Sequence, residues 1–271
     1  MGKPLGEWGL NINRGILTGF NDAFIISGEK KDELIKADPK SAELIRPILR
    51  GRDIKRYSCS FADLWLIYIP WHFPLENDET IVGASEKAEQ LFKEQFPAVY
   101  NHLLQYKTEL SNRNKAETGI RYEWYALQRW GAKYRNDFNE QKIVWGNLCL
   151  SAQFALAGEG FYINAPSPMI VPGNKYILAV LNSKLADWYI RHLGVTRNGG
   201  YFEYKPMFIQ KLPVPELTQE EQKPFSALVD KIITAKKSDN DTTEFERQID
   251  VLIYSLYGLT NDEIAVVESS R

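Results

Sequence analysis

The chain has 271 residues, of which 44% are hydrophobic and 13% aromatic, enough for a large core, so an intrinsically disordered protein is excluded. Its two cysteines, Cys59 and Cys149, have no second cysteine or histidine at ligand spacing, which is typical of neither a disulfide framework nor a zinc protein. The longest apolar stretches are too short to span a bilayer, and no leader pattern precedes them. We therefore expect a cytoplasmic protein with no membrane partner.

The formal net charge of −2 is unevenly distributed along the chain. Residues 1–215 contain 27 basic and 23 acidic residues, whereas residues 216–271 contain 6 basic and 12 acidic residues. A mildly basic body followed by an acidic tail indicates a functional division, although a small positive balance over so long a body is also ordinary for a protein surface.

The first distinctive stretch, residues 14–26, contains Gly15 and Gly19. A phosphate-binding P-loop needs a lysine and a serine or threonine directly after its last glycine, and a dinucleotide-binding loop needs a third glycine. Neither pattern is present. Residues 23–26 have the composition of a short strand, which Ser27-Gly28 closes. We therefore interpret the stretch as a glycine-containing turn that leads into a strand.

Helical and extended patterns follow each other without a fixed repeat in the next part of the chain. Residues 30–49 predict a helix interrupted at Pro39, and residues 64–70 predict a buried strand that ends at a proline. Apolar side chains recur at helical spacing over 86–110, where Pro97 is expected to break or kink the helix.

Short strands are predicted in the middle of the chain, where glycine, asparagine and proline separate apolar stretches. These stretches are residues 143–150, 153–156, 160–164 and 168–171. Their short connections predict a sheet with antiparallel neighbours. Apolar positions at helical spacing then predict a helix over 176–193.

The C-terminal segment has clear helix start and stop signals. The capping box Thr218–Glu221 opens a charged helix that is expected to continue to about residue 237. A second apolar pattern predicts a helix that ends at Gly258, and the capping box Thr260–Glu263 predicts a short third helix.

The sequence contains few motifs that are typical of catalytic sites. The three histidines are scattered, with no second ligand at metal spacing, and no Gly-x-Ser-x-Gly motif is present. Glu140 and Lys142, with Asp137 upstream, weakly resemble a nuclease motif, which would predict metal-dependent cleavage by this chain alone. Because no nucleophile, cofactor loop or metal set is found, the sequence argues against autonomous catalysis, a bound cofactor and a metal site.

Two basic clusters are the main functional signal. Five lysines and arginines lie within residues 46–56, and seven lie within residues 107–135, where they alternate with tyrosine and tryptophan. Cations contact phosphates, and arginine forks and aromatic rings contact bases, so such stretches are typical of nucleic-acid binding. Two other interpretations stay open: a solvated surface over packed aromatic stems, and a protein-interaction hot spot at Trp124–Trp130.

Several phrases, taken in order, resemble the TaqI-like C-terminal specificity domain, the target-recognition part of adenine-specific DNA methyltransferases and of fused restriction-modification enzymes. The phrases are Gly15-Ile-Leu-Thr-Gly19-Phe-Asn21-Asp-Ala23-Phe24, Leu49-Arg-Gly-Arg-Asp53-Ile54, Leu181-Asn-Ser-Lys-Leu185, Gly199-Gly-Tyr201-Phe-Glu-Tyr204-Lys205-Pro206, Leu212-Pro-Val-Pro215 and, in the tail, residues 248–260. The likeness covers nearly the whole chain, and the ordered set is specific although no single phrase is.

The catalytic half of such enzymes has no counterpart in this sequence. Family members carry an upstream methyltransferase domain with a cofactor-binding loop and an Asn-Pro-Pro-aromatic motif. The nearest string here, Asn164-Ala-Pro166-Ser167, lacks the second proline and the aromatic residue. We therefore expect a fragment of a longer enzyme or a free-standing specificity subunit, with S-adenosylmethionine bound by the missing methyltransferase domain and no cofactor in this chain.

Patterns and resemblance together predict an α+β fold, with a mixed or antiparallel sheet, flanking helices and a helical C-terminal tail. Residues 1–215 are expected to form a DNA target-recognition domain, and residues 216–271 a tail that packs on it or on the methyltransferase domain. The implied partners are double-stranded DNA and that methyltransferase domain, in the same polypeptide or in a partner subunit. The implied function is sequence-specific recognition that directs adenine methylation, with or without cleavage, by other domains.

An alternative is a protein-interaction module or a specificity subunit that docks a methyltransferase. For DNA binding, the contacts expected from charge and context are Arg50, Arg52, Arg56, Arg113, Arg121, Arg129, Lys133, Arg135, Arg197, Asn198, Tyr201 and Lys205.

Overall fold

Short apolar strands from the middle of the chain form a central sheet together with one strand from near the N-terminus. The computed structural model, which describes residues 2–194 and 196–269, orders these strands β10-β8-β12-β2, with antiparallel pairing throughout. Their bounds are Asn11–Arg14 (β2), Lys142–Trp145 (β8), Phe154–Ala157 (β10) and Pro168–Val171 (β12). The prediction of antiparallel neighbours in this segment is confirmed for β8, β10 and β12. It is wrong for the predicted strand at 160–164, because Tyr162 and Ile163 belong to a different sheet and pair in parallel with residues 48–49.

Both faces of the central sheet are covered, which explains why β8, β10 and β12 carry apolar residues at successive positions. Neighbouring side chains along a strand point to opposite faces. Ile143 and Trp145 of β8 belong to a buried cluster shared with helix α6 (Lys175–Asn182), whereas Val144 belongs to a second buried cluster. The sheet therefore lies between two hydrophobic cores.

A second, mixed sheet has the order β11-β4-β7-β3, in which only the pairing of β11 with β4 is parallel. Its strands are Ile25–Ser27 (β3), Ile45–Leu49 (β4), Leu64–Ile67 (β7) and Tyr162–Ile163 (β11). The helix predicted over 30–49 is wrong for its last residues, because Ile45 pairs with Ile67 and Ile48 pairs with Tyr162. Long-range strand pairing overrides the local helical spacing there.

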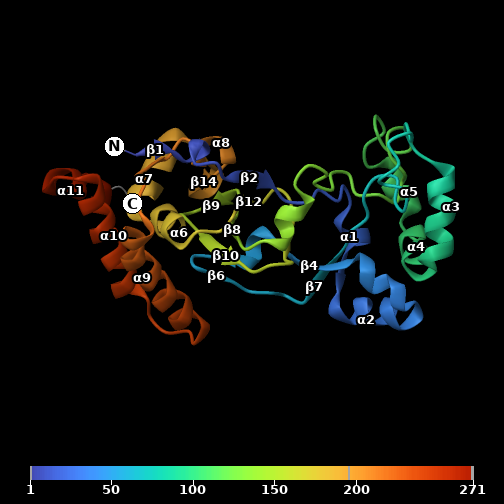
Figure 1. The fold of residues 1–271 in the computed structure, drawn as a ribbon, viewed down its shortest axis with the longest axis horizontal. Coiled ribbons are helices and arrows are strands. Elements are labelled where there is room, and N and C mark those ends of the chain that lie inside the picture. Colours follow the sequence, from blue (N-terminus) through green and yellow to red (C-terminus); the bar gives the residue numbers. More distant parts are fainter. Residues whose placement is uncertain (1, 195, 270–271) are drawn as a thin grey trace.

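Five helices of the described chain lie at the end of the molecule that carries the second sheet (Figure 1); the first two pack against strands β3 and β7, and the fourth packs on these two helices. They are Asn21–Phe24 (α1), Gly28–Ala37 (α2), Glu86–Gln95 (α3), Pro97–Leu104 (α4) and Lys107–Asn112 (α5). The predicted strand at 23–26 is thus only partly correct, because its first residues end α1 and the strand begins at Ile25. Pro97 is in the first turn of α4, where the main-chain N–H of any residue would have no acceptor within the helix, so proline costs no hydrogen bond there. The break predicted at this proline is confirmed.

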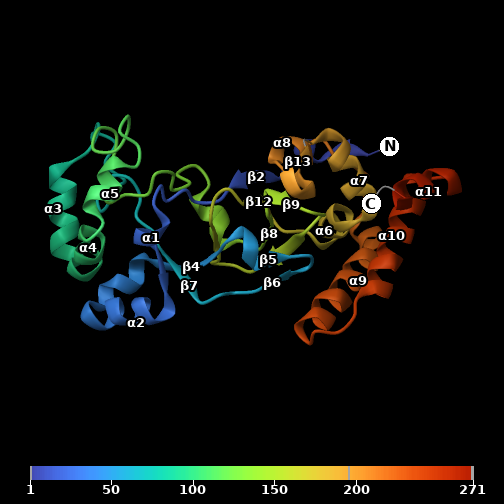
Figure 2. The same ribbon diagram turned by 180° about the vertical axis from the view of Figure 1, so that it is seen from behind.

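The other end is formed by α6 with Lys184–Leu193 (α7), Gln219–Lys237 (α9), Thr243–Tyr257 (α10) and Asn261–Ser269 (α11), as both views show (Figures 1 and 2). The capping box Thr218–Glu221 is confirmed, since the main-chain N–H of Thr218 donates to the Glu221 carboxylate at 2.8 Å. The helix predicted over 176–193 is instead divided at Ser183, whose hydroxyl caps α7. Within the described residues, no helix has both the length and the apolar composition that crossing a membrane requires.

Smaller elements complete the fold. They are Lys3–Pro4 (β1), Ile54–Lys55 (β5), Ser58–Cys59 (β6), Leu148–Cys149 (β9), Thr196–Arg197 (β13), Tyr201–Glu203 (β14), Pro206–Ile209 (α8) and Pro213–Val214 (β15), with 3₁₀ turns at Leu5–Glu7, Pro39–Leu44, Gly51–Asp53, Arg135–Asn139 and Asn198–Gly200. Strands β13, β14 and β9 form a small antiparallel sheet. The α+β fold class is confirmed.

The glycine-containing stretch links the two larger sheets. Directly after β2, the N–H of Gly15 donates to the main-chain carbonyl of Ser167, and the N–H of Ile16 donates to the carbonyl of Ile163 at 2.7 Å. A Cβ on Gly15 would lie 2.3 Å from that carbonyl oxygen, so only glycine permits this approach. Leu17 then exchanges main-chain hydrogen bonds with Arg129. We call this segment, residues 15–17, the crossing segment.

Candidate nucleic-acid interface

Three adjoining hollows, all lined by Asn147 and Pro166, form what we call the cationic cleft. Asn147 lies in the turn between β8 and β9, and Pro166 lies in the loop between β11 and β12. The hollows have volumes of about 670, 620 and 600 Å³. Their lining comes from strand ends and loops that are far apart in sequence, and the two sheets hold these in place.

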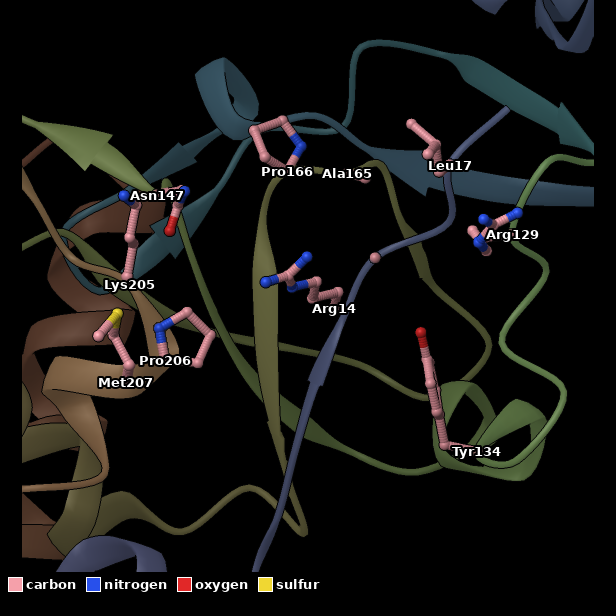
Figure 3. A pocket seen from close by; sticks show the side chains of 11 residues that line it. Arg14, Leu17, Arg129, Tyr134, Asn147, Ala165, Pro166, Lys205, Pro206 and Met207 are labelled. Atoms are coloured by element: carbon pink, nitrogen blue, oxygen red, sulfur yellow. The ribbon is translucent and has the colours of Figure 1, made fainter. Parts of the chain in front are cut away.

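The first hollow contains Arg14, the last residue of β2 (Figure 3). Lys205 and Met207 lie on one side of Arg14, and Arg129 and Tyr134 lie on the other. The lining therefore combines three cations with apolar and aromatic side chains.

The second and third hollows extend this cationic surface. The second is lined by the β13–β14 hairpin, including Arg197, Asn198 and Glu203. The third is lined by basic residues of the 50–55 segment together with Tyr201, the β8–β9 turn and Asn164. Its basic lining residues are Arg50, Arg52 and Lys55, and no carboxylate side chain is among the residues that line it.

Several cations of the cleft are held by carboxylates of low exposure. Glu203 accepts hydrogen bonds from Arg197 Nε at 2.6 Å and pairs with Lys205 Nζ at 2.8 Å, and these bonds hold the pKa of Glu203 below its ordinary value. Glu117 in the same way accepts from Arg129 at 2.8 Å and from Arg121 at 3.0 Å, which lowers the pKa of Glu117.

Arg50 is fixed by the neighbouring Asp53. Its Nε and Nη2 donate to the two carboxylate oxygens of Asp53 at 2.9 and 2.8 Å, and its main-chain N–H donates to the same group. Burial by itself would raise the pKa of Asp53, but the hydrogen bonds from Arg50 outweigh burial and lower that pKa. The guanidinium therefore has a defined orientation at the edge of the third hollow.

Other cations of the cleft are available to a ligand. Arg14, Arg52 and Lys55 are exposed, and none forms an ion pair with another residue that the structure describes. Unneutralised cations facing a common cleft attract anions, and their attraction adds over the surface. The cleft thus has an excess of positive charge although the chain as a whole has a formal net charge of −2.

Exposed apolar side chains gather in the same cleft. Leu148, Leu150 and Met207 are each about half exposed, at 50%, 52% and 51%, and Leu17 and Tyr201 are exposed as well. All five line one of the three hollows. An exposed apolar group surrounded by polar residues indicates an interaction surface.

The structure brings together many of the residues predicted to contact DNA, from segments that are distant in sequence. Those that line the cleft are Arg50, Arg52, Arg129, Arg197, Asn198, Tyr201 and Lys205. Arg121 lies beside it through its shared partner Glu117, whereas Lys133 and Arg135 are exposed but line none of the three hollows.

Two predicted residues have protein partners elsewhere. Arg56 lies in a different hollow, where its guanidinium pairs with Glu246 of α10. Arg113 donates to the main-chain oxygens of Thr18, Trp124 and Ala126, and burial lowers its pKa to about 10. Both arginines thus hold segments of the fold together.

Residues that the sequence reasoning missed occupy central positions. Arg14 lies within the first hollow, and Asn147 lines all three hollows. Neither stands in a basic cluster, so composition gave no signal for them. The position of Arg14, directly before a glycine that the fold requires, is the one sequence feature that could have drawn attention to it.

Two alternative interpretations are changed by the structure. The proposed aromatic hot spot is wrong for Trp124 and Tyr125, which are buried at 6% and 0% exposure and pack within a core. Lys142, considered for a nuclease site, is fully buried, and its ammonium group donates to the carbonyls of Phe138 and Gly158 while burial lowers its pKa to about 8. In the part of the chain that the structure describes, no three His, Cys, Asp or Glu side chains gather as metal ligands.

The fold resembles that of a solved restriction-modification enzyme. A solved structure of the type IIL restriction-modification enzyme MmeI in complex with DNA superposes with a TM-score of 0.66 at 12% identity, over 97% of this chain and 35% of that one. The type IIG restriction endonuclease BpuSI gives a TM-score of 0.49 at 14% identity, over 93% of this chain and 31% of that one. This chain thus spans about a third of either solved chain.

Sequence comparison defines the family. Residues 46–214 match the TaqI-like C-terminal specificity domain, and the chain belongs to that family. A curated relative, the type II methyltransferase M.MjaIV of Methanocaldococcus jannaschii, is 24% identical over 251 residues, which are 90% of this chain and 78% of the relative. The family predicted from the ordered sequence phrases is confirmed.

Proposed function

We propose that this chain recognises specific sequences in double-stranded DNA and so directs adenine methylation by a methyltransferase domain that the chain does not contain. The observation that carries the proposal is the cationic cleft. Arg14, Arg52 and Lys55 are free to contact phosphates, which gives affinity and orientation without sequence content.

Sequence readout requires donors and acceptors in fixed positions, and the cleft supplies them beside the phosphate-binding cations. Arg50 and Arg197 have guanidinium groups fixed by carboxylates, and Asn147 and Asn198 add amide groups. Each well-placed bidentate contact to a base edge contributes about 1–3 kcal/mol of discrimination. Apolar groups such as Met207 suit the thymine methyl group.

The remaining parts of the proposal concern the whole enzyme. The methyl donor, S-adenosylmethionine, would be held by the methyltransferase domain, and this chain would take no part in catalysis. Residues 1–215 would carry the DNA contacts, since every residue that lines the cleft belongs to them. Residues 216–271 would support the fold, since α9 packs on α6.

The test is selection of bound duplexes from a randomised pool by the full chain, sequenced after binding at low and at physiological salt. We expect enrichment of a short motif and affinity that falls steeply with salt. Binding that enriches no motif would show that the chain does not read sequence by itself.

A second candidate function is docking of a partner protein, which the exposed Leu148, Leu150 and Met207 favour. Salt separates the two functions, because contacts to phosphates release counterions whereas an apolar interface does not. If no duplex binding is detected at either salt concentration, the docking function is favoured.

A further inference from the structure

Two carboxylates of the cleft region have the same unusual arrangement. Glu203 is 7% exposed and holds two cations, Arg197 and Lys205, whose side chains are 53% and 39% exposed. Glu117 is 14% exposed and holds Arg121 and Arg129, at 59% and 48%. In each group the carboxylate is largely buried, whereas its two cations are much more exposed to solvent.

The two groups flank the same binding surface. Lys205 of the Glu203 group and Arg129 of the Glu117 group line the first hollow on opposite sides of Arg14 (Figure 3). Elsewhere in the cleft, Arg52 and Lys55 have no such partner among the described residues. The two carboxylates therefore hold cations at the flanks of the cationic cleft, where a duplex bound in the cleft would contact these cations.

A paired cation differs from a free one in two ways. Its long-range attraction for phosphate is reduced, because the carboxylate cancels part of the charge. Its orientation is also fixed, so fewer side-chain conformations are lost when it forms a directed hydrogen bond. The first effect lowers affinity for every duplex alike, whereas the second favours the duplex whose groups match the fixed donors.

We propose that Glu203 and Glu117 are positioning residues that lower non-specific affinity and increase sequence selectivity, by holding two cations each at the flanks of the cleft. This inference rests on the proposed DNA recognition. It assigns to the acidic residues a part in specificity beyond keeping the protein folded.

The experiment uses the full chain with Glu203→Gln and, separately, Glu117→Gln. Binding is measured between 50 and 200 mM salt to two duplexes: the one most enriched by the unchanged chain, and a scrambled duplex of equal length and composition. Glu29→Gln is the matched control, because Glu29 is exposed on α2, lines none of the three hollows and gives the same change in charge. Urea-unfolding midpoints identify variants that remain folded.

If the inference holds, either cleft variant binds the scrambled duplex more tightly, and the enriched-to-scrambled affinity ratio falls. The slope of log K against log salt steepens by about one unit for each released cation, which over this fourfold salt range adds about a fourfold loss of affinity. Glu29→Gln leaves slope and ratio unchanged.

The inference is overturned if folded cleft variants behave like the control, or if they lose affinity for both duplexes in equal proportion. Since the two glutamates belong to separate elements, a folding defect in one variant leaves the other to decide. Failure of the proposed function would give a different result, because the unchanged chain would then enrich no motif and its duplex affinity would not depend on salt. That result would contradict both the proposed function and this inference.

Discussion

Arg56→Ala should destabilise the fold and leave DNA binding nearly unchanged, although Arg56 stands in the same basic cluster as Arg52. Its guanidinium pairs with Glu246 of α10 and also contacts the carbonyl of Ala152 at 3.4 Å. The side chains of Arg56 and Glu246 are 28% and 18% exposed. The pair therefore joins the β5–β6 region to the C-terminal helices in a largely buried setting.

The expected magnitude follows from this partial burial. Breaking a fully buried pair by removing one partner costs about 3–5 kcal/mol, and an exposed pair contributes about 0–1 kcal/mol. For Arg56→Ala we expect a loss of about 2 kcal/mol, since Thr242 and Lys236 still partner Glu246. In a chain of this length the melting temperature should fall by about 4–8 °C.

Urea unfolding of Arg56→Ala, Glu246→Gln and the double variant measures the pair directly. We expect a coupling energy of about 1–2 kcal/mol. Arg247→Ala is the matched control, because its partner Glu244 is exposed at 59%, and its effect should stay below about 0.5 kcal/mol. An unchanged midpoint for Arg56→Ala, together with weakened duplex binding, would refute the reasoning.

The same pair should make stability depend on pH. Burial by itself would raise the pKa of Glu246, but the attraction of Arg56 outweighs burial and lowers that pKa. A carboxylate with a lowered pKa stabilises the folded state above its unfolded pKa of about 4.3 and loses this effect as pH falls through the lower folded value. The stability difference between the unchanged chain and Glu246→Gln should therefore be constant near neutral pH and shrink below about pH 4.

Further substitutions test other parts of the molecule. Arg52→Ala and Lys55→Ala should each weaken binding to all duplexes alike and reduce the slope of log K against log salt by about one unit. Fluorescence anisotropy measures both effects, and a change of preferred motif would contradict a contact to phosphate. Gly15→Ala should lower the free energy of unfolding by about 1–3 kcal/mol, because its Cβ would meet the Ile163 carbonyl. Gly158→Ala, with open space around it, is the control, and equal effects would argue against the steric explanation. Deletion of residues 216–271 should expose the apolar face of α6 and cause unfolding or aggregation, seen by circular dichroism and light scattering; a folded deletion that has lost only DNA binding would contradict the proposed division.

Elements defined by local signals could be predicted from the sequence. The helix after Thr218 begins at its capping box, and α10 ends at Gly258, because these signals depend on residues within one or two turns. Residues 45–49 could not be assigned in this way. Their strand conformation depends on β7 and β11, and β11 lies more than one hundred residues further along the chain.

The candidate interface was predictable only in part for the same reason. Arg50, Arg52, Arg56 and Arg113 look alike in sequence, yet each has a different environment once distant segments are brought beside it. Clustering of charge predicts a binding function, but it cannot distinguish cations that hold the fold together from cations that face the cleft.

The crossing segment has a consequence for the mechanics of binding. Main-chain hydrogen bonds join Ile16 to Ile163 and Ala165, and Leu17 to Arg129, at the side of the first hollow. We expect slow hydrogen exchange at the buried amide of Ile16, because opening its bond to Ile163 requires the two sheets to separate. A surface that is ordered before it meets its ligand loses little conformational freedom on association. Differences in affinity among variants of the lining residues should therefore report the contacts themselves rather than a rearrangement of the protein.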